Sequence, residues 1–290
     1  MPSRNPLSSV VVPTDFSDGS QQSLTRALRL PLGPKSKVTL LHVVPDDIPG
    51  ILRKEAILEA ERSLDKALAQ VHQLAIDRGL SPRQFVADVV EGDSAAQILK
   101  RAHTVEAEVI CMGRHGRTRL NLLELRIGST AKKVVKQGDV PVLLVRSPAK
   151  QVYRSALIAV DLTLGSIRVI KAAWPYVEDA ASVEVLHASS VPFENYVVVS
   201  GDRAEEFRDE ALKGATRDLN TLVAKTGLKA ETRVLGGDAR LLIIEEAKAR
   251  KAELIIVGTH GRKGVRKLIL GSVAEWIMTH ASCDVLVTRG

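Results

Sequence analysis

The chain has 290 residues, of which 45% are hydrophobic and 26% are charged, a composition typical of a folded globular protein. This length is sufficient for two domains of about 145 residues, each able to bury a core. The formal net charge of +7 favours anionic ligands, but only 3% of the residues are aromatic, which leaves little material for stacking on single-stranded nucleic acid.

No apolar run reaches the roughly 20 residues that a bilayer crossing requires. The first ten residues, MPSRNPLSSV, lack the apolar core of a signal peptide. We therefore expect a cytoplasmic protein without membrane contact. The two cysteines, Cys111 and Cys283, suggest neither a disulfide framework nor a zinc site, and we expect both to be small buried side chains.

Apolar strands alternate with amphipathic helices along the first half of the chain. Thr14, Asp15 and Ser17 supply side-chain oxygens for the start of the first helix, Ile51 to Arg78 has apolar residues at helical spacing, and Asp93 or Ser94 caps a third helix. The expected strands are Ser9 to Val12, Lys37 to Val44, Gln84 to Val90, Glu108 to Met112 and Val140 to Val145. This order predicts an α/β fold with an open five-stranded parallel sheet covered on both faces.

The second half repeats the first. Asp15 and Asp161 are 146 residues apart, His42 and His187 are 145 apart, and Gly128 and Gly271 are 143 apart, so the register holds along the whole chain. We expect domains at 1–148 and 149–290. The expected elements of the second copy are Ala156 to Val160, Ile167 to Ala173, Ser182 to His187, Arg203 to Thr226, Glu231 to Leu235, Arg240 to Ala249, Leu254 to Val257, Val273 to Thr279 and Asp284 to Thr288.

The last strand of each copy is expected at a sheet edge. An uncovered apolar edge strand is an association hazard. The simplest cover is the matching edge of the other copy, so we expect the two domains to pack as an intramolecular pseudo-dimer. Further homodimerisation is an open alternative.

A glycine-rich segment follows the fourth strand of each copy. It is MGRHGRTRLNLLELRIGS from Met112 to Ser129 and VGTHGRKGVRKLILGS from Val257 to Ser272. Glycines permit a tight turn and a close approach to a ligand, and the N–H groups at a helix start favour anions. Because open α/β sheets bind ligands at the carboxyl ends of their strands, we expect a phosphate-binding loop here. It is neither a Walker A loop nor a Rossmann GxGxxG loop.

Basic residues are concentrated beside both glycine segments. This local concentration suits the phosphates of a nucleotide better than a nucleic-acid duplex, which we do not expect as a partner. The residues are Arg114, Arg117, Arg119, Arg126, Arg262, Lys263, Arg266 and Lys267. A solvated surface is the ordinary alternative for such a charge run.

The two copies resemble the universal stress protein family in tandem form. The resemblance rests on PTDFS at Pro13 to Ser17, LLHVV at Leu40 to Val44, EGD at Glu91 to Asp93 and GTHGRKGVRKLILGS at Gly258 to Ser272. Nucleotide-binding members of that family carry Gly-x-x-Gly, nine residues and Gly-Ser/Thr, and the second copy fits this spacing. The resemblance implies adenine nucleotide alpha hydrolase-like, Rossmann-like domains that bind ATP, ADP or AMP, with or without Mg²⁺.

The resemblance also implies a set of nucleotide contacts in each copy. In the second copy, Asp161 and Ala188 would contact adenine, and the residues for ribose and phosphates would be Val257, Gly258, His260, Gly261, Gly271, Ser272 and Val273. In the first copy the corresponding positions are Pro13, Asp15, Val43, Met112, Gly113, His115, Gly116, Gly128, Ser129 and Thr130.

Two departures from the family pattern distinguish the copies. The first has eleven residues, Arg117 to Ile127, where nine are expected, which predicts that Gly128-Ser129 is displaced from Gly116. The second has AVDLT in place of PTDFS, so its base pocket is less typical. We expect the second copy to be the better phosphate site, and retention and loss of the first site are both open.

Each candidate residue also has an ordinary structural role. Asp15 and Asp161 can serve as helix-cap acceptors, and His42 and His187 lie inside apolar strands, where core histidines are more common than catalytic ones. His115 and His260 lie in the loops and are the better candidates for ligand contact.

The function that we expect is an ATP-binding stress-response regulator or sensor, not a fast enzyme. Hydrolysis needs a positioned base and usually Mg²⁺ held by carboxylates, whereas Glu124 and Glu275 are isolated, so we assign no catalytic or metal-ligating residue. Two alternatives are a slow ATPase or adenylyl-transferring enzyme, and a nucleotide-free protein interaction module.

Overall fold

The structure is a computed structural model that describes residues 6–114, 127–146, 148–177, 180–189, 202–259 and 270–289. The chain forms two compact units, Met1–Val152 and Tyr153–Gly290, against a predicted boundary after residue 148. None of the helices formed by the described residues combines the length and apolar character that a bilayer crossing requires.

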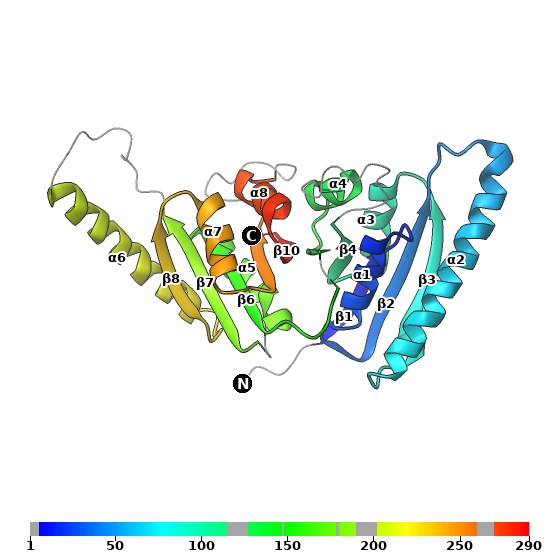
Figure 1. The fold of residues 1–290 in the computed structure, drawn as a ribbon, viewed down its shortest axis with the longest axis horizontal. Coiled ribbons are helices and arrows are strands. Elements are labelled where there is room, and N and C mark those ends of the chain that lie inside the picture. Colours follow the sequence, from blue (N-terminus) through cyan, green and yellow to red (C-terminus); the bar gives the residue numbers. More distant parts are fainter. Residues whose placement is uncertain are drawn as a thin grey trace. The chain divides into compact units, whose positions relative to one another are not determined.

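The first unit is a five-stranded parallel sheet, as the sequence predicts, and its strands lie in the order β3-β2-β1-β4-β5 (Figure 1). Its strands are β1 (Leu7–Pro13), β2 (Leu32–Val44), β3 (Phe85–Glu91), β4 (Val109–Gly113) and β5 (Val142–Val145). Its helices are α1 (Asp18–Ala27), α2 (Gly50–Ile76), α3 (Ser94–Thr104) and α4 (Ser129–Gln137), with a short 3₁₀ turn η1 (Pro82–Gln84) before β3.

The second unit repeats this topology in the order β8-β7-β6-β9-β10. Its parallel strands are β6 (Ser155–Val160), β7 (Ser182–Ser189), β8 (Glu231–Gly236), β9 (Leu254–Gly258) and β10 (Asp284–Thr288). Its helices are α5 (Leu164–Val177), α6 (Asp202–Ala224), α7 (Ala239–Ala249) and α8 (Ser272–His280). The predicted elements of both copies are confirmed.

Right-handed crossovers determine which face each helix covers. The chain moves from β1 through β2 to β3 in one direction, so α1 and α2 cover one face, and it returns through β4 to β5, so α3 and α4 cover the other. Accordingly α3 packs on α4, and α7 packs on α8. The central strands are therefore buried on both sides, and Val10, Val11 and Ile110 are fully buried. Cys111 is buried as predicted, whereas Cys283 is half-buried.

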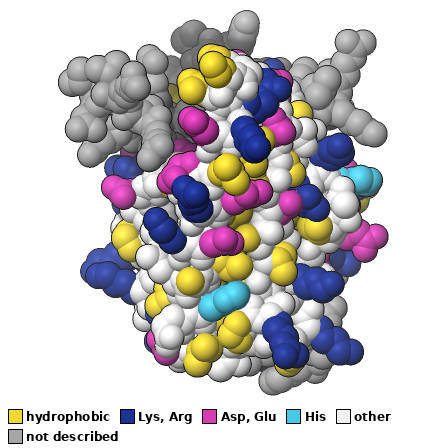
Figure 2. Space-filling view, turned by 90° about the vertical axis from the view of Figure 1, so that its right-hand side faces the viewer, with side chains coloured by type: hydrophobic (Ala, Val, Ile, Leu, Met, Phe, Trp, Pro, Cys, Tyr) yellow, Lys and Arg dark blue, Asp and Glu magenta, His cyan; other side chains and the backbone are white. Residues whose placement is uncertain are grey.

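The surface beside α2 carries charges of both signs. In the view of Figure 2, lysines, arginines, aspartates and glutamates alternate over this face, with hydrophobic side chains scattered between them. The described residues of this face therefore lack the continuous basic patch that binding of a nucleic-acid duplex requires.

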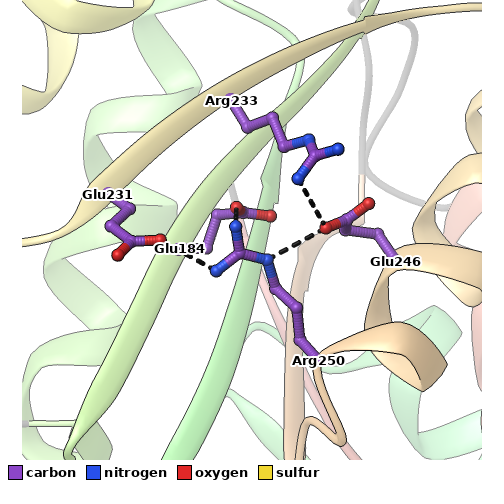
Figure 3. Close-up of polar contacts among 5 residues, drawn as sticks. All are labelled: Glu184, Glu231, Arg233, Glu246 and Arg250. Carbon is purple, nitrogen blue, oxygen red and sulfur yellow. Dashed lines mark hydrogen bonds and ion pairs between the residues drawn. The ribbon is translucent and has the colours of Figure 1, made fainter.

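A network of ion pairs joins two strands and a helix near the amino ends of β7 and β8 (Figure 3). Glu184 on β7 is 1% exposed and pairs with Arg250, the residue that caps α7. Arg250 also lies 2.8 Å from Glu231 on β8 and 2.9 Å from Glu246 on α7, and Arg233 lies 3.1 Å from Glu246. Burial raises the pKa of Glu184, while the charge of Arg250 opposes this shift.

The first unit holds the equivalent contact with the charges reversed. Arg101 on α3 pairs with Asp88 on β3. These residues stand 145 positions before Glu246 and Arg233, so the helix carries the cation in one repeat and the anion in the other. The two repeats thus have the same backbone arrangement, and in each one the helix residue has the charge opposite to that of its partner on the strand.

The raised pKa of Glu184 predicts a pH-dependent contribution to stability. The folded protein retains this proton to higher pH than the unfolded chain, so the stability that protonation adds is present below the unfolded pKa and is lost as pH rises through the folded pKa. We expect the free energy of unfolding of the unmodified chain, minus that of Glu184→Gln, to fall as the pH rises above about 4.3, the ordinary pKa of a glutamate. Urea titrations measure both, with the exposed Glu61→Gln as control. A difference that rises with pH would contradict this account.

Backbone strain at two helix ends predicts stabilising substitutions. Glu106 and Lys251 follow the last residues of α3 and α7 with φ of 49° and 52°, a left-handed conformation that glycine adopts without a Cβ clash. We expect Glu106→Gly and Lys251→Gly each to raise the free energy of unfolding by about 0.5–1 kcal/mol. The matched control is Gly79→Ala after α2, where φ is +70° and the added Cβ meets nothing within 4 Å. It should lower that free energy, and a gain in stability there would contradict the strain argument.

Candidate functional site

A cavity of about 270 Å³ lies at the carboxyl ends of β1, β2 and β4 in the first unit. It is lined by residues at these strand ends, by Ser20 of α1 and by residues near the starts of α3 and α4. The lining residues are Pro13, Thr14, Asp15, Ser20, Leu41, His42, Val43, Ser94, Ile98, Met112, Gly113, Gly128, Ser129, Thr130 and Ala131. The cavity therefore lies at the edge of the sheet where the sequence predicts a ligand site.

Eight of the ten positions predicted in the first copy line this cavity. They are Pro13, Asp15, Val43, Met112, Gly113, Gly128, Ser129 and Thr130. The remaining two, His115 and Gly116, lie outside the described residues. Their role as nucleotide contacts stays a prediction.

The start of α4 presents backbone N–H groups to the cavity. Gly128 is the N-cap and provides no side-chain oxygen, so the helix has no side-chain cap hydrogen bond. By contrast, Ser17 caps α1 by accepting from the N–H of Ser20, and Asp93 caps α3 by accepting from the N–H of Ala96. The first turn of α4 therefore keeps the donors and the positive dipole end that bind anions.

The start of α8 has the same form in the second unit. Its N-cap is Gly271, again without a side-chain cap bond. The Gly271 N–H donates to the Thr259 carbonyl at 2.8 Å, just as the Gly128 N–H donates to the Arg114 carbonyl at 2.9 Å. Both helix starts therefore hold the same hydrogen bond to the residue after the strand, although the loop of the first copy is two residues longer. The predicted displacement of Gly128-Ser129 from Gly116 lies outside the described residues and stays a prediction. The expectation that the second copy is the better phosphate site stays a prediction.

Gly113 at the end of β4 is required by packing as well as by the cavity. A Cβ at this position would lie 2.6 Å from the carbonyl carbon and oxygen of Gly19, at the start of α1. The next residue, Arg114, is 2% exposed, and burial followed by repulsion from Arg146 lowers its pKa to about 10. Arg114 is therefore still charged at neutral pH and adds positive potential close to the strand end.

Asp15 lines the cavity from a tight turn that follows β1. Its Oδ1 accepts hydrogen bonds from the N–H of Ser17 at 3.1 Å and from the hydroxyl of Ser17 at 2.5 Å. Phe16 between them has φ of 60°, and Leu162 at the equivalent position of the second unit has φ of 63°. A positive φ at a bulky residue is strained, and such strain is concentrated at functional sites. The predicted cap-forming role of this turn is confirmed through Ser17.

His42 lines the cavity, although the sequence favoured a core role. Its Nδ1 lies 2.8 Å from the Thr14 carbonyl oxygen, and its ring stacks on Phe16 with a centroid distance of 4.6 Å. The equivalent His187 makes the same contact, at 2.9 Å to Val160, but is 2% exposed. The core interpretation therefore holds for His187 and is incomplete for His42.

The predicted residues of the second unit also lie at the carboxyl edge of its sheet. Asp161 follows β6, Ala188 is near the end of β7, and Val257 and Gly258 end β9. Gly271, Ser272 and Val273 form the start of α8. His260 and Gly261 lie outside the described residues.

Several cavity residues were not assigned to the site from the sequence. Four of them, Ser20, Ser94, Ile98 and Ala131, belong to helices, and a helix turns only some of its residues toward a given cavity. Ser94 directly follows the cap residue Asp93, and Ala131 is the third residue after the cap residue Gly128, and this closeness to a helix start is the signal that would have found them. Among the described residues, no group of three or more His, Cys, Asp and Glu side chains is placed to hold a metal ion.

Comparison with known proteins supports one family for both units. A sequence model of the universal stress protein family matches residues 7–146 and again 153–289. Universal stress protein A homolog 2 of Coxiella burnetii is 32% identical over 147 residues, which are 47% of this chain and 95% of that protein. A universal stress protein of Methanocaldococcus jannaschii is 34% identical over 107 residues, which are 37% of this chain and 61% of that protein.

Solved structures show the same fold over the full tandem length. A universal stress protein from Archaeoglobus fulgidus has a TM-score of 0.70 at 19% identity and matches 97% of this chain and 98% of its own. A second, from Pseudomonas aeruginosa, has a TM-score of 0.68 at 19% identity and matches 98% of this chain and 93% of its own. With both halves matched by the family model and one relative matched over nearly its whole length, the chain belongs to the universal stress protein family.

Proposed function

We propose that this chain binds an adenine nucleotide, ATP or its products ADP and AMP, at the carboxyl edges of its sheets and acts as a cytoplasmic stress-response regulator or sensor. The observation that carries the proposal is the start of α4. There a glycine N-cap leaves the first-turn N–H groups without a side-chain cap, and Ser129, Thr130 and Ala131 line a cavity.

The cavity residues fit the two ends of a nucleotide. Phosphates suit the start of α4, where the dipole and the first-turn N–H groups favour negative charge. The lining also offers the carboxylate of Asp15 and the apolar residues Leu41 and Val43, which suit a flat base with an amino group. Mg²⁺ can accompany the phosphates without a dedicated protein site.

Regulation by binding is favoured over rapid catalysis. Asp15 is the one carboxylate among the described cavity residues, and it follows β1, on a different element from α4. A hydrolytic water would need a positioned base beside the phosphates. The family that contains this chain is named for the stress response, which supports a role in that process.

Two matched charge substitutions test the site. Ser129 and Ser272 are the first residues of α4 and α8, and an aspartate at a helix start stabilises the helix while repelling phosphate. We expect Ser129→Asp to weaken ATP binding to the first unit, and Ser272→Asp to weaken binding to the second, each by about tenfold or more, because 1.4 kcal/mol of repulsion is a factor of ten. Isothermal titration calorimetry of the unmodified chain and of both variants measures the two sites.

Several outcomes would contradict the proposal. If the unmodified chain shows no heat with ATP, or if both substitutions leave the affinity unchanged, the nucleotide is not bound at these helix starts. Sustained release of phosphate that stops in either variant would assign the slow ATPase alternative instead. Melting curves of the variants should match or exceed that of the unmodified chain, which separates a lost site from a lost fold.

A further inference from the structure

We propose that the two repeats are unequal sites: the first selects an adenine ribonucleotide through its polar end, and the second binds the phosphates of nucleotides with little selection of base or sugar. The inference rests on the proposed nucleotide function and deepens it. It follows from side chains that differ between the repeats on a shared backbone.

The first difference is the use of one serine. In the second repeat the Ser166 hydroxyl donates to Asp161 Oδ1 at 2.8 Å, and the same oxygen accepts from the N–H and the hydroxyl of Thr163 at 3.1 and 2.7 Å. Three donors of the chain thus converge on one carboxylate oxygen. Each of these bonds competes with a ligand donor for that oxygen, since a carboxylate has a limited number of acceptor positions.

In the first repeat the equivalent serine is directed elsewhere. Ser20 donates its hydroxyl to the Ser17 carbonyl at 2.8 Å, not to Asp15, and it accepts from the hydroxyl of Thr14 at 3.0 Å. The residue equivalent to Thr14 in the second repeat is Val160, which has no hydroxyl to hold Ser166 in that arrangement. Thr14 is therefore a positioning residue that fixes Ser20 beside Asp15 without placing its proton on the carboxylate.

The second difference is a loss of hydroxyl groups. Ser94 and Thr130 line the cavity of the first repeat, and the equivalent residues of the second are Ala239 and Val273. Hydroxyls that line a cavity can bond the hydroxyl and amino groups of a ligand, whereas methyl groups cannot. A site built to hydrogen-bond a ligand group rejects the analogue that lacks it far more strongly than an apolar site does.

The third difference is the exposure of a histidine. His42 is half-buried, lines the cavity and stacks on Phe16, whereas His187 is buried and has Leu162 in place of the phenylalanine. The backbone of the phosphate end is shared, because both helices begin with glycine and serine and both glycines donate to the strand-end carbonyl, although Val273 and Thr259 replace Thr130 and Arg114 there. The repeats are alike in the backbone that would bind phosphate and unlike in the side chains that would contact base and sugar.

Single-site variants of the full chain measure the selectivity of each repeat. The Ser272→Asp chain has only the first site intact, and the Ser129→Asp chain has only the second. Calorimetry measures the binding of four ligands to each chain: ATP, GTP, 2′-deoxy-ATP and inorganic tripolyphosphate. We expect the first site to bind ATP at least about tenfold more tightly than GTP or 2′-deoxy-ATP. We expect the second to bind all three nucleotides within about threefold, with tripolyphosphate closer to ATP than in the first site.

Near-isosteric exchanges then test the residues. Thr14→Val with Ser94→Ala in the Ser272→Asp chain should reduce the preference for ATP over GTP while leaving tripolyphosphate affinity unchanged, a result that general loss of structure would not give. Ser166→Ala in the Ser129→Asp chain should raise the preference for ATP, because it removes one donor from Asp161. Equal selectivity in both repeats, or exchanges without effect on the ratios, would overturn the inference while the nucleotide function stands. Absence of binding by every nucleotide would overturn both.

Discussion

Phosphate binding in both repeats would depend on a helix start that lies at the end of a buried strand and has no side-chain cap on its N–H groups. In both repeats a glycine N-cap donates to the carbonyl of the residue that follows the strand, and no cap side chain occupies the first turn that comes after it. The strand is held in place because it is buried between helices on both faces. The hydrogen bond from the glycine N-cap therefore fixes the position of the helix start relative to the strand. An anion site made of backbone alone tolerates wide change in the side chains around it.

Such tolerance explains how the two repeats diverge without losing their fold. Arg101 and Asp88 in the first repeat correspond to Glu246 and Arg233 in the second, so an ion pair is retained with its polarity reversed. Buried Glu184 and its partner Arg250 are found in the second repeat alone. The equivalent residues of the first repeat are the uncharged Thr39 and Val105. Each repeat thus needs its own set of charges, although the order and register of strands are shared.

Much of the fold could be predicted from the sequence, because its signals are local. Buried strands appear as short apolar runs, and Asp93 caps α3 through the bond that its position suggests. Gly113 of the candidate site follows from the rule that parallel sheets bind ligands at their carboxyl edge, whereas Pro13 and Asp15 follow from the resemblance to the family. Other features depend on packing between distant segments. Gly113 lies against the Gly19 backbone, and Gly128 and Gly271 donate to equivalent carbonyls although the segments before them differ in length. Neither contact could be read from spacing. His42 and His187 occupy equivalent positions in similar strands, yet their burial differs because their neighbours do.

The most direct test of the central claim is amide hydrogen exchange, at residue resolution, in the first turns of α4 and α8 with and without ATP. If backbone N–H groups bind the phosphates, ATP should slow exchange at Ser129 to Ala131 and at the equivalent Ser272 to Ala274, and adenosine, which has no phosphate, should not. ATP binding that leaves these amides unprotected in both repeats would contradict the account.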